Sequence, residues 1–253
     1  MKSLLGGWPV LAIAALIGAP PAAAQPAPAE ILRRIDQNMT IASARSRAEM
    51  IVKYRSGDVR RMEFLSWAQG RDRSFLEFTK PARDAGSRFL RLEGNMWIFL
   101  PTVGKSVRIQ GHMLRQGLMG SDFSYGDASE NPSMVDDYDA TVERSDTLDG
   151  RATWVLKLEG KRTDLAYPSR RLWVDAERWV PLKEERYARS GKLLKTATMG
   201  DVRRVGGRWY PFLVELDDAL QVETRTSLQF LEIEVGVRVP AELFTLRRLE
   251  KGS

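Results

Sequence analysis

An alternation of apolar and polar residues begins near Ala44 and continues almost to the end of the chain. Short turns interrupt it, among them Gly57-Asp58, Asp149-Gly150 and Gly206-Gly207. A period of two is typical of strands that bury one face, and short glycine turns connect antiparallel neighbours. The pattern therefore predicts about a dozen antiparallel strands in sequential order, within one domain. The expected strands are residues 44–54, 59–68, 73–79, 86–93, 96–100, 106–109, 138–145, 152–159, 170–175, 179–189, 193–205, 208–216 and 222–235.

A sheet of this size has to curl, because an open twisted sheet with so many strands cannot remain flat. The expected product is a barrel or half-barrel in a chain that is mainly β with a few helices. Its concave face needs a cover. Residues 29–39 predict a helix that could supply one, since Pro28 stands near its start and apolar residues recur on one face. These apolar residues are Ile31, Leu32, Ile35 and Met39.

A second candidate cover lies within residues 95–127, which combine a strand that is apolar on both faces with a glycine-rich segment. In that segment, residues 111–120, unbranched apolar side chains stand between three glycines. Unbranched Met and Leu can repack against a variable partner, which favours a mobile flap over something apolar. The alternative is a long loop that packs its own apolar residues over the sheet. The apolar residues of the segment are Met113, Leu114, Leu118 and Met119.

The first residues indicate export. The chain begins Met1-Lys2-Ser3, continues with an apolar run at residues 10–17 and reaches Ala22-Ala23-Ala24. A basic start, a short apolar middle and a small-residue site are typical of a secretory signal peptide. No later stretch approaches the roughly 20 apolar residues that cross a bilayer. We therefore expect a signal peptide at residues 1–24, cleaved after Ala24, and a mature domain at residues 25–253.

The residue types limit the chemistry. The chain has no cysteine and one histidine, His112, so disulfides, thiol nucleophiles and the usual zinc sites are excluded. No G-x-S-x-G elbow accompanies Ser121-Asp122, which weakens a hydrolase hypothesis centred on His112. The acidic cluster Asp136-Asp137-Asp139 is more typical of a solvated turn than of a cation site. We predict that the protein is not an enzyme and has no catalytic residue, cofactor or metal.

The net charge of +6 could suggest a nucleic acid partner. However, Lys and Arg alternate with Asp and Glu throughout the chain, as on the solvent faces of strands, and export argues against nucleic acid. Transient contact with anionic membrane surfaces remains compatible with this charge.

Large apolar side chains are numerous, with seven Trp, nine Met and nine Phe. They could simply form the core. Together with a curled sheet and the lack of catalytic groups, they favour an apolar cavity. Each methylene of an acyl chain buried there would contribute about 0.8 kcal/mol. Five of the tryptophans fall in expected strands: Trp67, Trp97, Trp154, Trp173 and Trp209.

Several motifs resemble those of outer-membrane lipoprotein-sorting proteins of the LolA/LolB-like superfamily. The most specific are M-W-I-F-L-P, G-K-S-V-R-I and G-S-D-F-S-Y-G-D, all within residues 96–127. Looser likeness extends over the mature chain in E-I-L-R-R-I-D-Q-N-M, L-W-V-D-A-E-R-W-V-P-L and V-P-A-E-L-F-T-L-R-R-L. No arginine can be matched to the cargo-gating arginine of the lipoprotein carrier, so the identity of the cargo stays open.

The resemblance implies an incomplete β-barrel of curled antiparallel sheet, with a helical lid over a hydrophobic cavity. It implies a monomeric periplasmic carrier and chaperone that binds acyl chains of lipoproteins or lipids and moves them toward the outer membrane. An inner-membrane transporter of the RND or ABC type would be its partner. The alternative function is a periplasmic sensor or interaction module that docks on an inner-membrane regulator or lipid exporter.

The expected ligand-binding residues come from strands 96–100 and 152–159 and from the segment between them. The first strand is apolar on both faces, so the sequence does not decide which face lines the cavity. The expected cavity and lid residues are Trp97, Phe99, Met113, Leu114, Leu118, Met119, Phe123, Tyr125, Trp154, Leu156 and Leu158.

Overall fold

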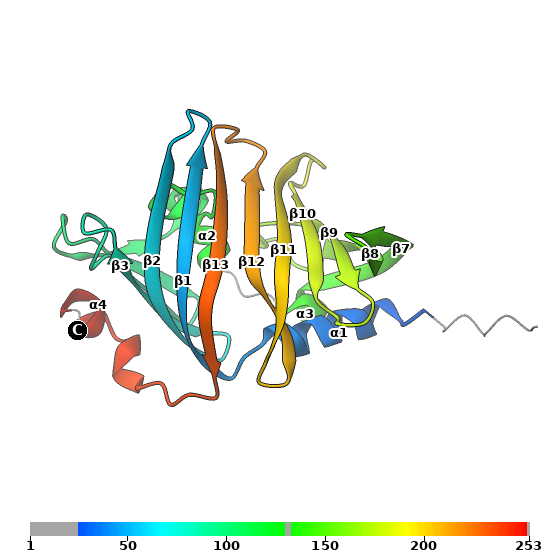
Figure 1. Ribbon diagram of the computed structural model, residues 1–253, viewed down its shortest axis with the longest axis horizontal. Helices are drawn as coiled ribbons and strands as arrows, with labels where there is room; N and C mark the ends of the chain where they lie inside the picture. Colours follow the sequence, from blue (N-terminus) through cyan, green and yellow to red (C-terminus); the bar gives the residue numbers. More distant parts are fainter. Residues whose placement is uncertain (1–24, 130–132, 252–253) are drawn as a thin grey trace, which may run out of the picture.

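The computed structural model describes residues 25–129 and 133–251, so the predicted signal peptide at residues 1–24 lies outside the described part. Thirteen antiparallel strands form one sheet (Figure 1). The predicted boundaries agree closely, and those of β6 and β11 agree to the residue. The strands are β1 (Ser43–Tyr54), β2 (Val59–Gln69), β3 (Arg73–Lys80), β4 (Arg88–Leu92), β5 (Asn95–Phe99), β6 (Ser106–Ile109), β7 (Tyr138–Leu148), β8 (Arg151–Gly160), β9 (Ser169–Asp175), β10 (Pro181–Tyr187), β11 (Leu193–Val205), β12 (Arg208–Asp218) and β13 (Thr224–Val235).

The order of the strands differs from a simple meander at one point. Across the sheet the order is β6-β5-β4-β3-β2-β1-β13-β12-β11-β10-β9-β8-β7. Strand β1 therefore lies in the middle and pairs with both β2 and β13, for example at Met50 with Met62 and Leu228. Each half is sequential, but β6 and β7 form opposite edges. The segment at residues 110–137, here called the crossover segment, has to pass from one edge to the other.

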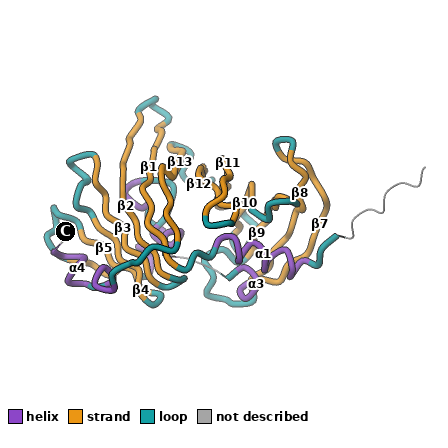
Figure 2. The backbone as a smooth tube through the Cα atoms, turned by 60° about the horizontal axis from the view of Figure 1, so that its bottom comes forward, coloured by secondary structure: helices purple, strands orange, loops and turns teal. Residues whose placement is uncertain are grey.

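The sheet curls into a trough whose two edges do not meet (Figure 2). The predicted incomplete β-barrel of mainly β class is confirmed. Alternate residues of the central strands point to the concave face, as Ala48, Met50 and Val52 of β1 do. In the described part of the chain, no helix is long and apolar enough to cross a membrane.

The first part of the crossover segment, up to Tyr125, packs along the concave face of β1–β6, and its last residues, 134–137, lie beside helix α1. The segment contains two 3-10 turns, η1 (Gly111–Arg115) and η2 (Leu118–Gly120), and two short helices, α2 (Tyr125–Ser129) and α3 (Met134–Asp137). Its glycines permit close packing, since a Cβ at Gly117 would lie 2.3 Å from the Ser121 carbonyl oxygen. Six of its apolar side chains pack on the concave core of this half: Met113, Leu114, Leu118, Met119, Phe123 and Tyr125.

Helix α1 (Pro28–Met39) covers the other half of the trough, beside β7–β9. Its buried apolar face packs on Leu156, Leu158 and Leu172, all of which are fully buried. The Asp36 carboxylate on the same helix accepts hydrogen bonds from the backbone N–H groups of Met134 and Val135, at 3.0 and 3.2 Å. Helix α1 is therefore tied directly to the end of the crossover segment.

The C-terminal segment covers part of the convex face. The turn η3 (Ala241–Phe244) and helix α4 (Leu246–Lys251) lie against the outer side of β3–β5. There Phe75, Leu90 and Phe99 pack with Leu243, Phe244 and Leu249. Strand β5 is apolar on both faces for this reason, since the crossover segment covers one face and the C-terminal segment the other.

We expect Leu156→Ala to lower the free energy of unfolding by about 2–5 kcal/mol, because it opens a cavity between β8 and helix α1. The matched control is Leu246→Ala, at a leucine that is 45% exposed, which should change stability by less than about 0.5 kcal/mol. Urea unfolding of both variants measures the difference. Equal stability of the two variants would contradict the packing described for α1.

Candidate functional site

The two apolar clusters leave a cavity of about 300 Å³ between them on the concave face. Strands β9–β13 form its floor, and helices α1 and α3 contribute to its walls. Five charged residues, Asp36, Asp127, Arg170, Glu184 and Arg186, lie on its border. The remaining lining residues are Ile35, Met39, Met134, Leu172, Pro181, Ala197, Met199, Tyr210, Pro211, Val214, Leu228 and Phe230.

A second hollow of about 230 Å³ adjoins the first, next to the start of β1 and the end of β2. Met39, Tyr210 and Phe230 line both hollows. Small residues make the room here, because the concave positions that carry Met50 and Met62 farther along β1 and β2 are occupied by alanine and serine. These small residues are Ala44, Ser46, Ser66 and Ala68.

A buried ionic network fixes the crossover segment at the edge of the cavity. The Asp127 side chain is only 3% exposed and accepts hydrogen bonds from Lys195 Nζ at 2.5 Å and from Arg186 Nη1 at 2.7 Å. The Tyr167 hydroxyl donates to the same carboxylate at 2.6 Å. Burial alone would raise the pKa of Asp127, but the charges of Arg186 and Lys195 outweigh it and hold the pKa well below its usual value. Asp127 is therefore ionised and links the segment to β10 and β11.

The network continues on the concave side of β9 and β10. Arg186 also pairs with Glu184 at 2.9 Å, and Glu184 pairs with Arg170 at 2.7 Å. Arg170 Nε donates to the Tyr138 hydroxyl at 2.7 Å. Each of these charges has a partner of opposite sign, so the network joins β9, β10 and the crossover segment to one another.

Asp122 anchors the crossover segment a second time. Its carboxylate accepts hydrogen bonds from the hydroxyls of Thr224 and Thr226 on β13, at 2.7 and 2.6 Å. Its backbone carbonyl accepts one from Lys195 Nζ at 2.7 Å. The motif G-S-D-F-S-Y-G-D thus supplies both acidic anchors, Asp122 and Asp127.

Sequence reasoning missed this ionic network, although a signal for it was present. Arg170 is in phase with the inward apolar residues of β9, and Lys195 with those of β11. On β10, Glu184 and Arg186 share the inward face, although a register shift separates them from the inward Pro181. Charges at inward positions of three consecutive strands indicate a buried network, because isolated charges there would be costly.

The structure distributes the expected ligand-binding residues over three places, and none of them lines either hollow. Trp97 and Phe99 lie on the convex face beneath the C-terminal segment. Leu156 and Leu158 are buried beneath α1, with Trp154 beside them against Trp179 at a centroid distance of 4.8 Å. The remaining six form the packed crossover segment: Met113, Leu114, Leu118, Met119, Phe123 and Tyr125.

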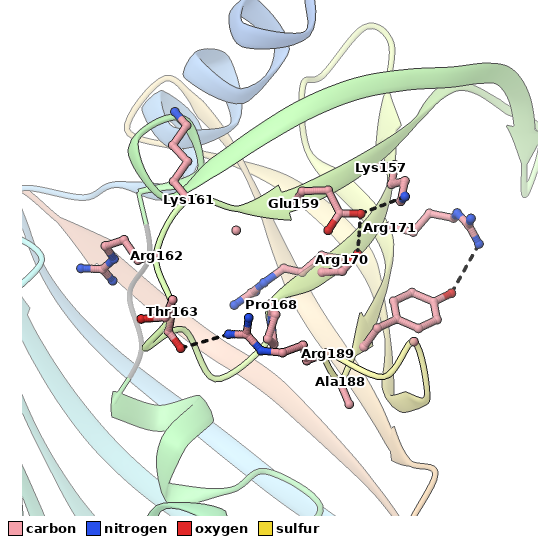
Figure 3. Close-up of a pocket in the computed structure, with 14 residues that line it drawn as sticks. Lys157, Glu159, Lys161, Arg162, Thr163, Pro168, Arg170, Arg171, Ala188 and Arg189 are labelled. Carbon is pink, nitrogen blue, oxygen red and sulfur yellow. Dashed lines mark hydrogen bonds and ion pairs between the residues drawn. The ribbon is translucent and has the colours of Figure 1, made fainter.

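A polar pocket of about 420 Å³ lies at the ends of β8–β10 (Figure 3). Its charged side chains are largely engaged with neighbours. Lys157 pairs with Glu159 at 2.9 Å, and Arg171 pairs with Glu143 at 2.8 Å. Arg189 donates to the Thr163 carbonyl at 3.4 Å (Figure 3). An apolar ligand would gain little in such a polar pocket, which leaves the concave hollows as the candidate site.

His112 is exposed at the start of the crossover segment. Ser121, the nearby serine, is buried and donates its hydroxyl to the Leu118 carbonyl at 2.7 Å. Within residues 25–129 and 133–251, no group of three or more His, Cys, Asp or Glu is placed to hold a metal ion.

The comparisons with known proteins identify the fold. The chain resembles a DUF1329 family protein from Desulfovibrio piger, with 22% identity over 87% of this chain and 97% of that one and a TM-score of 0.80. It also resembles a candidate outer-membrane lipoprotein-sorting protein domain from Vibrio parahaemolyticus, with 22% identity over 88% and 98% and a TM-score of 0.77. A LolA superfamily protein from Nitrosomonas europaea has 22% identity over 87% and 98% and a TM-score of 0.72.

The predicted resemblance to lipoprotein-sorting proteins is confirmed, and at these identities it establishes the LolA-like fold. A family model with the description "Uncharacterized protein" matches residues 70–251, and the chain belongs to the family that this model describes. No curated protein matches the chain in sequence.

We expect Asp127→Asn to lower the free energy of unfolding by about 3–5 kcal/mol, because Arg186 and Lys195 would lose a buried counter-charge. The double variant Asp127→Asn/Lys195→Met should regain part of the lost free energy of unfolding. Asp164→Asn, at an exposed aspartate, serves as the control. Urea unfolding measures all four proteins. An unchanged stability of Asp127→Asn would contradict the role of the network.

The low pKa of Asp127 also predicts a dependence on pH. A carboxylate with a lowered pKa stabilises the folded state fully above its unfolded pKa of about 3.9. This contribution is lost as the pH falls through the folded pKa. The stability difference between the wild type and Asp127→Asn should therefore be constant from pH 5 to pH 8 and shrink below about pH 4. Unfolding curves at several pH values test this, and a difference that persists unchanged at low pH would refute it.

Proposed function

We propose that this protein is a periplasmic carrier that holds the acyl chains of lipids or lipoproteins in the concave cavity and moves them toward the outer membrane. The observation that carries the proposal is the unfilled apolar space between the two core clusters. Protein interiors are close-packed, so a cavity of about 300 Å³ in the middle of a concave face is unusual for a purely structural core.

The lining chemistry supports an acyl ligand. Ligand pockets are lined mainly by apolar side chains with a few polar groups at one side, and this cavity has that composition. Met39, Met134 and Met199 contribute flexible thioether side chains that can adapt to chains of different length. Each methylene that enters would contribute about 0.8 kcal/mol.

The lid in this proposal is helix α1, whose last residue, Met39, lines both hollows. Leu156 and Leu158 would then support the lid, because they pack against helix α1 and hold it on the sheet. The six apolar residues of the crossover segment would set the far limit of the cavity.

Export and direction of transport belong to the same proposal. The signal-peptide pattern at residues 1–24 supports the periplasm. The fold shared with a candidate lipoprotein-sorting domain supports a carrier rather than an enzyme. An RND-type or ABC-type transporter in the inner membrane would load it.

Two substitutions on β13 test the proposal. Leu228→Trp fills the cavity, and Leu231→Trp makes the same change at a side chain that is 38% exposed on the same strand. We expect Leu228→Trp to bind a fluorescent fatty acid about tenfold more weakly, equivalent to losing about two buried methylenes. Leu231→Trp should bind as the wild type does.

Mass spectrometry of lipid extracted from the purified wild-type protein accompanies the titration. Recovery of acyl-bearing molecules from the wild type, and less from Leu228→Trp, is the expected result. No extracted lipid together with no fatty acid binding would reject the carrier. A stoichiometric inner-membrane partner recovered without cargo transfer would instead support the sensor alternative.

A further inference from the structure

The second hollow contains a buried arginine. Arg91 on β4 is 9% exposed and lines the hollow together with the small residues of β1 and β2. It points to the concave face, as does Phe89 two residues earlier on the same strand, which packs in the concave core. The aromatic wall of Tyr210 and Phe230 lies across the same hollow and continues into the first cavity.

The charge of Arg91 is poorly compensated. Its hydrogen bond runs from Nε to the Ser74 hydroxyl at 3.4 Å, and within the described residues Nη1 and Nη2 have no partner. The residues described also place no carboxylate within 4 Å of it, and the attraction of Asp72 is the one favourable charge interaction it has. Burial lowers the pKa of Arg91, and Asp72 offsets this only in part. A guanidinium offers five donors, so most of its capacity is unused.

The other buried cations on the concave face differ in this respect. Lys195, Arg170 and Arg186 each pair with Asp127 or Glu184 at 2.5–2.7 Å. On the convex face, Arg88 stacks on the Phe99 ring at 4.4 Å and donates to the Glu250 carbonyl. Arg91 alone among these five combines an unpaired guanidinium with an open hollow.

A largely buried guanidinium whose unused donors face an open hollow is suited to an anionic ligand that supplies the acceptors. We propose that Arg91 binds the acidic head group of the cargo, so that the protein selects anionic amphiphiles. The acyl chain occupies the first cavity, past Tyr210 and Phe230, and phosphate oxygens accept hydrogen bonds from Nη1 and Nη2. This inference rests on the proposed carrier function and adds the class of ligand to it.

The surroundings of Arg91 suit a head group. Ala44, Ala68 and Gly70 leave room, and the hydroxyls of Ser46 and Ser66 lie 2.6 Å from each other in the same hollow. A phosphate placed there meets a guanidinium and the one hydroxyl proton that the serine pair leaves free, while its attached chain meets apolar side chains on the other side. Guanidinium and phosphate form paired charge-assisted hydrogen bonds, which are stronger than neutral ones.

The test compares two lipids with the same acyl chain, 1-oleoylglycerol 3-phosphate and 1-oleoylglycerol, by calorimetric titration into the mature protein below their micelle-forming concentrations. We expect the wild type to bind the phosphate lipid about tenfold more tightly, or 1.4 kcal/mol. Arg91→Leu should remove this preference and keep the affinity for 1-oleoylglycerol. Arg73→Leu, which removes an exposed arginine from the neighbouring strand, should keep the preference.

The possible outcomes separate the inference from the function on which it rests. If both lipids bind the wild type equally well, the head-group inference falls and the carrier proposal stands. If neither lipid binds, both fall. If inorganic phosphate binds the wild type as tightly as the phosphate lipid does, the ligand is free phosphate. This result would reject the inference that the protein selects anionic amphiphiles.

Stability supplies a second readout. If Arg91 serves a ligand, removing its uncompensated charge should leave the unfolding midpoint of Arg91→Leu unchanged or higher than that of the wild type. Arg91→Gln, which keeps a polar group at the site, should behave in the same way. A lower midpoint in both variants would assign Arg91 to the structure of the sheet and overturn the inference.

Discussion

The architecture depends on one topological constraint, the passage of the chain from β6 at one edge of the sheet to β7 at the other. In this structure the connection between the two edges crosses the concave side of the sheet. Once there, its polar backbone and charged side chains need partners away from water. Asp122 and Asp127 meet this need through two threonines of β13 and the cations of β10 and β11. The same crossing fills the concave face of β1–β6 and leaves a cavity between this packed region and the one beneath helix α1.

This division explains why the molecule keeps empty space without losing its fold. The crossover segment provides the core of β1–β6, and helix α1 provides that of β7–β9. Between these two covers, strands β9–β13 border the cavity with inward residues that include Ala197, Val214 and Leu228. The sheet there is supported from both sides, so its own concave residues remain available for a ligand.

The sequence predicted local structure well because that information is local. Alternation and glycine turns identified the strands, and apolar spacing identified helix α1. The incomplete barrel followed from strand number together with family resemblance. The β6–β7 crossing could not be predicted in this way, since strand pairing across the chain leaves little trace in any single strand. Trp97 and Phe99 show the same difficulty: their strand is apolar on both faces, and only the tertiary structure reveals that the C-terminal segment covers their side.

Asp36 gives the cover of the cavity a mechanical property. It fastens helix α1 to the N-terminus of α3, and α3 ends the segment that Asp122 and Asp127 hold against the sheet. Moving α1 away from the sheet therefore either breaks the Asp36 hydrogen bonds or displaces α3 together with the helix. If helix α1 is the lid of the proposed carrier, its opening therefore depends on the strength of the Asp36 hydrogen bonds to α3.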